Sequence, residues 1–161
     1  MVNNRSYFKS ISWSLLITIL IFVIFKMFVQ HYRLSGDCME PSFKDGQSYF
    51  VNRISPYVRQ YQIGDVVVFK YENKNWIARV VALENDTIEI NEEKILVNNI
   101  QLKDKVAKNW VDWKYGVYAV DKTIKIPSGH IFVLSDNLSA HHDDSRVFGP
   151  ISNLVIVGVV W

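Results

Sequence analysis

The chain has 161 residues, of which 49% are hydrophobic and 14% aromatic, so it can fill the core of one domain and is not a disordered chain. Its single cysteine, Cys38, excludes an internal disulfide and a zinc site built from several cysteines. Residues 1–30 carry three basic residues and no Asp or Glu, so the rest has 15 basic against 16 acidic residues. Such a nearly neutral chain lacks the basic surface that nucleic acid requires, and we expect no nucleic-acid partner.

Residues 11–29 (ISWSLLITILIFVIFKMFV) form an apolar stretch close to the length that a helix needs to cross a bilayer. A buried core helix is one alternative, but a helix that is apolar on all sides suits a small β-rich domain poorly. A cleaved signal peptide is another, but no small residues of the Ala-x-Ala kind follow the stretch. The sequence therefore predicts an uncleaved transmembrane anchor at 11–29.

Basic residues on the two sides of this stretch set its expected orientation. Arg5 and Lys9 precede it, and two basic residues near its other end reduce the contrast. The positive-inside rule then places residues 1–10 in the cytoplasm. We expect a single-pass protein of the cell membrane, with residues 30–161 forming an extracytoplasmic domain.

β-Branched and aromatic runs bounded by turn residues predict strands through the rest of the chain. The predicted strands are residues 48–53, 64–71, 76–83, 87–90, 94–97, 130–134 and 154–161. Residues 72–75 and 91–93 are polar and of hairpin length, so each joins two of these strands. No stretch after residue 30 shows a sustained helical period. The expected fold is mainly β, a folded or barrel-like sheet that follows one transmembrane helix.

Four segments carry residues suited to chemistry, and each also has an ordinary structural explanation. Cys38 follows a Gly-Asp turn in residues 36–42 (GDCMEPS), as an exposed nucleophile would, but a lone cysteine is most often a small buried apolar residue. Residues 64–69 (GDVVVF) and 78–86 (ARVVALEND) are, taken alone, a turn and core strands. Residues 135–146 (SDNLSAHHDDSR) form a polar loop between two apolar strands.

The histidines of that loop are the only candidates for a metal site. His141 and His142 are adjacent, but the single cysteine and the lack of a regular ligand spacing argue against a metal ion. The ordinary explanation is a solvated loop that holds an ion pair between Asp144 and Arg146. We therefore expect no metal site and no cofactor.

In this order the four segments resemble the type I signal peptidase family of the Gram-positive kind, and the resemblance runs from the apolar stretch to the last strand. The family's nucleophile motif Ser-Met-x-Pro-Thr, often preceded by Gly-Asp, is similar to residues 36–42. Its Gly-Asp strand is similar to 64–69, and its Lys-Arg-Val-Ile-Gly-Leu-Pro-Gly-Asp box to 78–86. Its Pro-x-Gly-x-x-Phe-Val-Leu-Gly-Asp-Asn-Arg and Ser-x-Asp-Ser-Arg motifs are similar to 127–138 and 142–146.

The resemblance implies an anchored, outward-facing, mainly β serine endopeptidase that removes signal peptides from translocated preproteins. In the family, a Lys kept neutral by burial takes the proton of the Ser nucleophile as it attacks the scissile carbonyl. Here Cys38 stands at the nucleophile position and Ala78 at the position of the general base, and a methyl group accepts no proton. Ser135 and Leu138 also replace the family's Gly and Arg. The chain thus resembles a catalytically inactive member that lacks the Ser/Lys dyad.

Other positions keep the family pattern and imply a preserved binding site. Met39, Pro41, Asp144 and Arg146 match the family's motifs. Gly36 stands where Gram-positive members place a small residue that supplies a second oxyanion donor, beside the backbone N–H of the nucleophile.

Three hypotheses of function follow. The first is an inactive homologue that binds extended signal peptides of secreted preproteins by β-addition, with the membrane and an active signal peptidase as further partners. The second is an active cysteine-type signal peptidase, in which His142 (or His141, if the extra loop residue follows it) is the base of Cys38 and Asp144 orients it. The third is a membrane-anchored structural or assembly protein without a peptide site.

Overall fold

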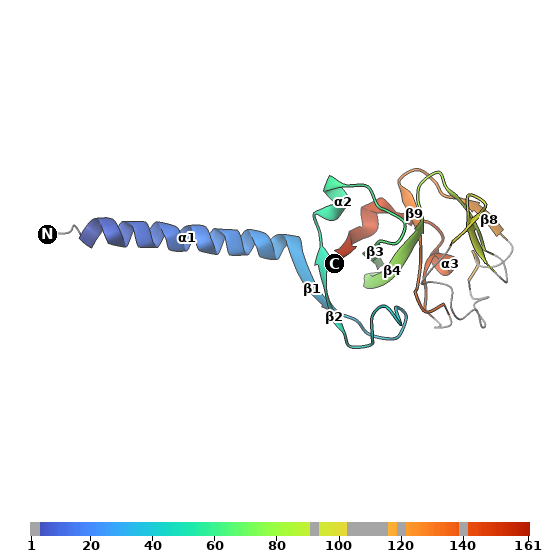
Figure 1. Cartoon of the computed structure of the whole chain (residues 1–161), viewed down its shortest axis with the longest axis horizontal. Coiled ribbons are helices and arrows are strands. Elements are labelled where there is room, and N and C mark those ends of the chain that lie inside the picture. Colours follow the sequence, from blue (N-terminus) through green and yellow to red (C-terminus); the bar gives the residue numbers. More distant parts are fainter. Residues whose placement is uncertain (1–3, 91–93, 103–115, 119–121, 139–141) are drawn as a thin grey trace.

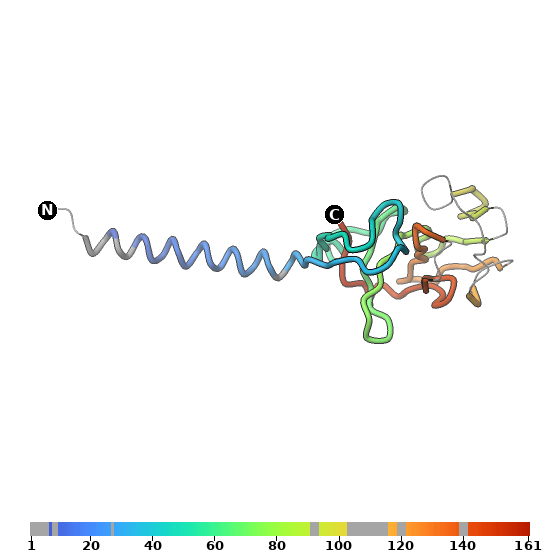
Figure 2. Tube along the Cα trace, turned by 90° about the horizontal axis from the view of Figure 1, so that it is seen from below, coloured from blue at the N-terminus to red at the C-terminus, as the bar shows by residue number. Residues whose placement is uncertain are grey.

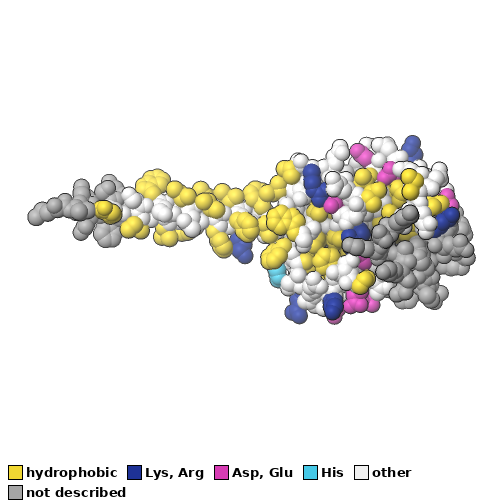
Figure 3. Space-filling view, in the orientation of Figure 1, with side chains coloured by type: hydrophobic (Ala, Val, Ile, Leu, Met, Phe, Trp, Pro, Cys, Tyr) yellow, Lys and Arg dark blue, Asp and Glu magenta, His cyan; other side chains and the backbone are white. Residues whose placement is uncertain are grey.

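A long N-terminal helix leads into a domain of β-strands (Figure 1). The computed structural model describes residues 4–90, 94–102, 116–118, 122–138 and 142–161. The helix, α1 (Asn4–Phe28), extends away from the domain and leaves large apolar side chains such as Trp13 and Phe22 exposed (Figure 3). Among the described ranges, no helix satisfies both the length and the apolarity required to cross a membrane.

Seven antiparallel strands form the main sheet, in the order β1-β2-β11-β3-β4-β9-β10. Their bounds are β1 (Val29–Arg33), β2 (Ser48–Asn52), β3 (Val66–Tyr71), β4 (Lys74–Ala82), β9 (His130–Leu134), β10 (Ile151–Ser152) and β11 (Ile156–Val160). A second sheet has the order β7-β6-β5-β8. Its strands are β5 (Thr87–Ile90), β6 (Ile95–Val97), β7 (Ile100–Gln101) and β8 (Lys122–Lys125). The prediction of a mainly β fold is confirmed.

Several predicted strands match the structure closely, and the differences lie at turns. The predicted strands 87–90 and 130–134 are β5 and β9. β4 begins at Lys74, two residues earlier than predicted, because Glu72 and Asn73 both take positive φ and close the hairpin as a two-residue turn. Figure 2 shows this hairpin extending from the domain.

The remaining differences concern short elements. The start of the predicted strand 154–161 lies instead in a 3₁₀ turn (Asn153–Val155), which the Ser152 side chain caps by accepting from Leu154 N–H. Four-residue helices α2 (Ser55–Val58) and α3 (Ser145–Phe148) are too short to produce a helical period in the sequence. The predicted hairpin loop 91–93 lies outside the described residues.

Buried side chains cover both faces of the main sheet. One group contains Val67, Phe69 and Ala78, and another contains Val68 and Cys38. Because successive side chains of a strand point to opposite faces, Val67 and Val68 of β3 assign these two groups to opposite faces of the sheet. A third group packs between the second sheet and the end of β4 and β9.

One part of the main sheet has a strand edge without a neighbour. β4 pairs with β3 from Lys74 to Arg79, but it pairs with β9 only from Arg79 onward. The other edge of residues 74–78 therefore meets no strand in the described part of the chain. A free edge presents backbone N–H and C=O groups that an added strand can pair with.

Candidate functional site

Cys38 lies in the loop between β1 and β2, which is closed by its own hydrogen bonds. Leu34 N–H donates to Gln47 C=O over 2.9 Å, and Gly36 N–H donates to an Asp45 carboxylate oxygen over 2.8 Å. The Cys38 side chain is buried against apolar neighbours such as Met39, as the ordinary explanation of a lone cysteine predicts. The loop thus fixes Cys38 rather than leaving it on a mobile surface.

A second loop, which follows β9, holds the same backbone from the other side. Asn137 N–H donates to Cys38 C=O over 2.9 Å, and the Asn137 side-chain amide donates to Asp37 C=O over 3.2 Å. These two bonds join segments that are about one hundred residues apart in the chain. They place Ser135 and His142 of the second loop beside Cys38.

A cavity of about 230 Å³, here called the Cys38 cavity, opens between these loops and the free edge of β4. Its lining residues are Tyr32, Arg33, Leu34, Ser35, Cys38, Tyr49, Lys74, Asn75, Trp76, Ile77, Ser135, His142 and Asp143. Residues 32–35 form one side and residues 74–77 of β4 form another. The cavity is therefore lined by two continuous stretches of chain, residues 32–35 and 74–77, together with the thiol.

Ala78 does not line this cavity. It packs with Val67 and Phe69 on one face of the sheet, whereas its neighbour Ile77 packs with Cys38 on the other face. The edge of β4 beside position 78 has no neighbouring strand in the described part of the chain, since β9 pairs with β4 no earlier than Arg79, and Trp76, packed against the same group as Ala78, does line the cavity. The structure thus leaves the methyl group of Ala78 in an apolar site, out of the cavity.

His142 lines the cavity but contacts a residue other than Cys38. Its Nε2 atom lies 3.0 Å from Asp37 Oδ1, and its ring packs on the backbone of Gly36. A Cβ atom at position 36 would lie 3.2 Å from His142 Cε1, which is closer than an ordinary contact. Gly36 also has φ +99°, a backbone conformation that favours glycine. Among the described residues, no side chain hydrogen-bonds the Cys38 thiol, and His141 lies outside them.

The surroundings of Cys38 favour its neutral form. Burial raises the pKa of the thiol to about 11, and the negative charges of Asp37 and Asp136 add to the shift. At neutral pH the thiolate fraction is then on the order of 10⁻⁴. Reactive cysteines show the opposite, a pKa lowered by cations or helix N-termini, so this thiol is not an activated nucleophile.

Asp144 and Arg146 form a buried ion pair in place of the solvated pair that the sequence suggested. Arg146 Nε and Nη2 donate to the two carboxylate oxygens of Asp144 over 2.9 and 2.8 Å. Ser135 N–H donates to Asp144 over 3.0 Å, and Arg146 Nη1 donates to Leu138 C=O over 3.1 Å. Asp144 is therefore occupied by Arg146 and shapes the loop, whereas Asp37 is the carboxylate that holds His142.

Arg79 joins three segments that the sequence singled out separately. It makes a two-pronged ion pair with buried Asp136, with 2.6 Å from its Nε to the nearer oxygen. It also donates to Gly64 C=O over 2.8 Å and to the Ser42 hydroxyl over 3.2 Å. Met39 is fully buried in the same region, and Pro41 follows a cis peptide bond. Arg79 thus ties the Cys38 loop to β4 and to the loop after β9, while Met39 packs against the thiol itself.

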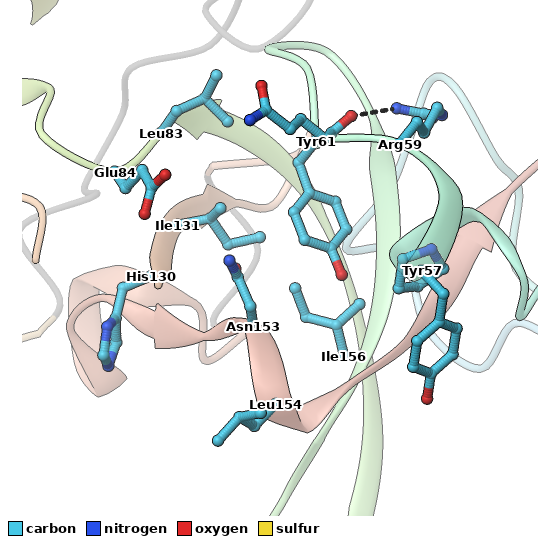
Figure 4. A pocket seen from close by; sticks show the side chains of 12 residues that line it. Tyr57, Arg59, Tyr61, Leu83, Glu84, His130, Ile131, Asn153, Leu154 and Ile156 are labelled. Carbon is cyan, nitrogen blue, oxygen red and sulfur yellow. Dashed lines mark hydrogen bonds between the residues drawn. The ribbon is translucent and has the colours of Figure 1, made fainter. Parts of the chain in front are cut away.

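A second cavity, of about 410 Å³, lies elsewhere on the domain and shares no lining residue with the Cys38 cavity. Figure 4 shows Tyr61 reaching into it beside Ile156 and Asn153. None of the site residues expected from the sequence lines it. The sequence did not single out three residues that belong to the Cys38 site: Asp37, Asn137 and Lys74. The carboxyl group beside the cysteine was the one available signal for Asp37.

The domain has two antiparallel sheets and a cavity next to a strand edge. Cys38, at the nucleophile position of the family pattern, lines that cavity, and this arrangement is that of a mainly β domain of the peptidase class. The profile described as "Signal peptidase, peptidase S26" matches residues 7–161. The chain therefore belongs to the signal peptidase family S26.

Individual relatives agree with this assignment. Signal peptidase I V of Bacillus subtilis (strain 168) is 34% identical over 138 residues, which cover 80% of this chain and 82% of that protein. Signal peptidase IB of Staphylococcus aureus is 32% identical over 160 residues, 88% and 81% of the two chains. The crystal structure of a signal peptidase I from Enterococcus faecalis V583 shares the fold, with a TM-score of 0.50 at 24% identity over 63% of this chain and 97% of that one.

Proposed function

We propose that this chain is a membrane-anchored signal peptidase homologue that binds signal peptides of secreted preproteins and does not cleave them. The observation that carries the proposal is the Cys38 cavity: it has a free strand edge for a peptide and, among the described residues, no base in contact with the thiol. The partners are the membrane, signal peptides and an active signal peptidase that shares those substrates.

The free edge of β4 supports binding by β-addition. Residues 74–77 line the cavity and have no strand on that side among the described residues. Residues 32–35 also line the cavity, so an extended peptide bound along the free edge of β4 would have this second stretch of backbone in the same cavity. A space of about 230 Å³ suits small side chains of the kind found before signal-peptide cleavage sites.

The absence of activity is supported by the chemistry around the thiol. Ala78 offers no lone pair, and among the described residues no histidine hydrogen-bonds the thiol, since the side-chain contact of His142 is the Nε2–H that it donates to Asp37. The raised pKa of Cys38 leaves almost no thiolate at neutral pH. A cysteine-type enzyme would require the other ring nitrogen of His142, Nδ1, to come within hydrogen-bond reach of the sulfur, with Asp37 as the orienting carboxylate.

The proposed anchor is the apolar part of α1. Large side chains from Ile11 to Phe25 are exposed in this helix. The domain begins at once after the helix, because Arg53 N–H donates to Phe28 C=O over 2.9 Å and ties β2 to the end of α1. This arrangement suits a peptide site held at a fixed place near the membrane surface.

A binding and cleavage experiment tests the proposal. The full chain in detergent micelles is mixed with a labelled peptide that spans an Ala-x-Ala cleavage site, and both anisotropy and product are followed. We expect saturable binding without product above the uncatalysed rate. Product formation that disappears in Cys38→Ala would favour the cysteine-type enzyme, and the lack of any binding would favour a structural protein.

A further inference from the structure

We propose that the Cys38 cavity prefers a peptide that ends in a free carboxylate, which is the cleaved signal peptide rather than the intact precursor. This inference rests on the proposed function of the same cavity. It concerns which form of the signal peptide is bound, because the cleaved form ends at the residue whose carbonyl would lie beside Cys38.

Neutral hydrogen-bond donors line the cavity beside the thiol. Ser135 lines it together with Cys38 and stands where the family resemblance places a Gly, whereas the Nε2–H of His142 is already donated to Asp37. A thiol held in its neutral form is itself a donor and brings no negative charge against a carboxylate. Two positions at which this chain departs from the family pattern, Cys38 and Ser135, thus present neutral donors to the cavity.

The fixed charges of the lining also favour an anion. Arg33 and Lys74 line the cavity, against one carboxylate in the lining, Asp143. Lys74 has no ion-pair partner among the described residues. The two other carboxylates nearby are already engaged, Asp37 by His142 and Asp136 by Arg79. A peptide carboxylate therefore meets unneutralised cations and donors rather than free acidic groups.

Three peptides that share one signal-peptide sequence test the inference in the full chain. One ends in a free carboxylate after Ala-x-Ala, the second ends in the matching amide, and the third continues for several residues as the precursor does. We expect the carboxylate form to bind about fivefold more tightly than either of the others. Equal affinity of the carboxylate and amide forms, or tighter binding of the precursor form, overturns the inference and leaves the proposed function standing. Failure of all three to bind overturns both.

Variants assign the preference to the cavity. Ser135→Gly should bring the ratio of carboxylate to amide affinity toward one. Lys74→Met should lower the same ratio, and Lys70→Met is its matched control because Lys70 is an exposed lysine of β3 that does not line the cavity. A ratio that is unchanged in both Ser135→Gly and Lys74→Met contradicts the assignment.

Discussion

The Nε2 atom of His142 lies 3.0 Å from Asp37 Oδ1, so the imidazole that lines the Cys38 cavity is held by the carboxylate of the residue next to Cys38. A Cys–His catalyst needs a ring nitrogen within hydrogen-bond reach of the sulfur, and the described residues show no such contact. The contact with Asp37 instead fastens the loop after β9 to the loop that carries Cys38. His142 is, in this arrangement, a part of the cavity wall.

The thiol of Cys38 should react slowly with an alkylating reagent. Its pKa of about 11, against 9.0 for an ordinary cysteine, lowers the thiolate at pH 7.5 by about 100-fold. The rate, measured with iodoacetamide from pH 6 to 10, should still rise with pH at the upper end. His142→Ala should leave the profile unchanged. A rate well above that of free cysteine near pH 7 would show an activated thiol and refute the inactive assignment.

The contact between His142 and Asp37 should appear in the titration of the carboxyl group. The hydrogen bond from His142 is the main cause that lowers the pKa of Asp37 below 3.8. Because the folded-state pKa is lowered, the contact stabilises the fold above pH 3.8, and that contribution is lost as the pH falls through the lowered pKa. In an NMR titration, His142→Ala should raise the pKa of Asp37 toward about 3.9. An unchanged value would mean that the contact is not formed.

The buried ion pair should matter more for stability than an exposed one. Arg146→Met leaves the Asp144 carboxylate buried without its cation, and we expect a loss of about 3–5 kcal/mol in the free energy of unfolding. Arg59→Met breaks the more exposed pair with Asp65 and should cost less than about 1 kcal/mol. Urea unfolding of both variants measures the difference. Similar losses would contradict the assignment of Asp144 and Arg146 as scaffold residues.

Restoring both family residues should restore some cleavage. Cys38→Ser combined with Ala78→Lys supplies a nucleophile and a base, and general base catalysis is typically worth about 10²–10⁴-fold over Cys38→Ser alone. Cleavage of a preprotein with an Ala-x-Ala site measures the gain. No gain in a folded double variant would show that a lysine at position 78 does not act as the base of the residue at position 38.

Alternating and β-branched runs were sufficient to predict the mainly β class and to locate β5 and β9. The short strands β1, β7, β8 and β10 have two to five residues and give no comparable pattern. Neither does a sequence show which runs pair. The main sheet places β11, the last strand, between β2 and β3, a long-range pairing that local pattern does not encode.

The site was predictable as a set of motifs but not as a geometry. The order of the four segments is sufficient to single out Cys38, Ala78, Asp144 and Arg146. The order of the segments does not show that Arg146 hydrogen-bonds both carboxylate oxygens of Asp144, or that Asp37 accepts a hydrogen bond from His142. These contacts depend on how the loops fold and meet. The polar loop looks solvated from its composition, yet its ion pair is buried.

Ala78 also bears on how costly a catalytic residue is to the fold. An amine at this position would have to lose its hydration among Val67, Phe69 and Val133, whereas the methyl group fits them without any such penalty. A chain released from peptide cleavage therefore gains stability by the very change that removes its base. Under the function proposed for this chain, alanine in place of lysine at position 78 both removes the base and stabilises the fold.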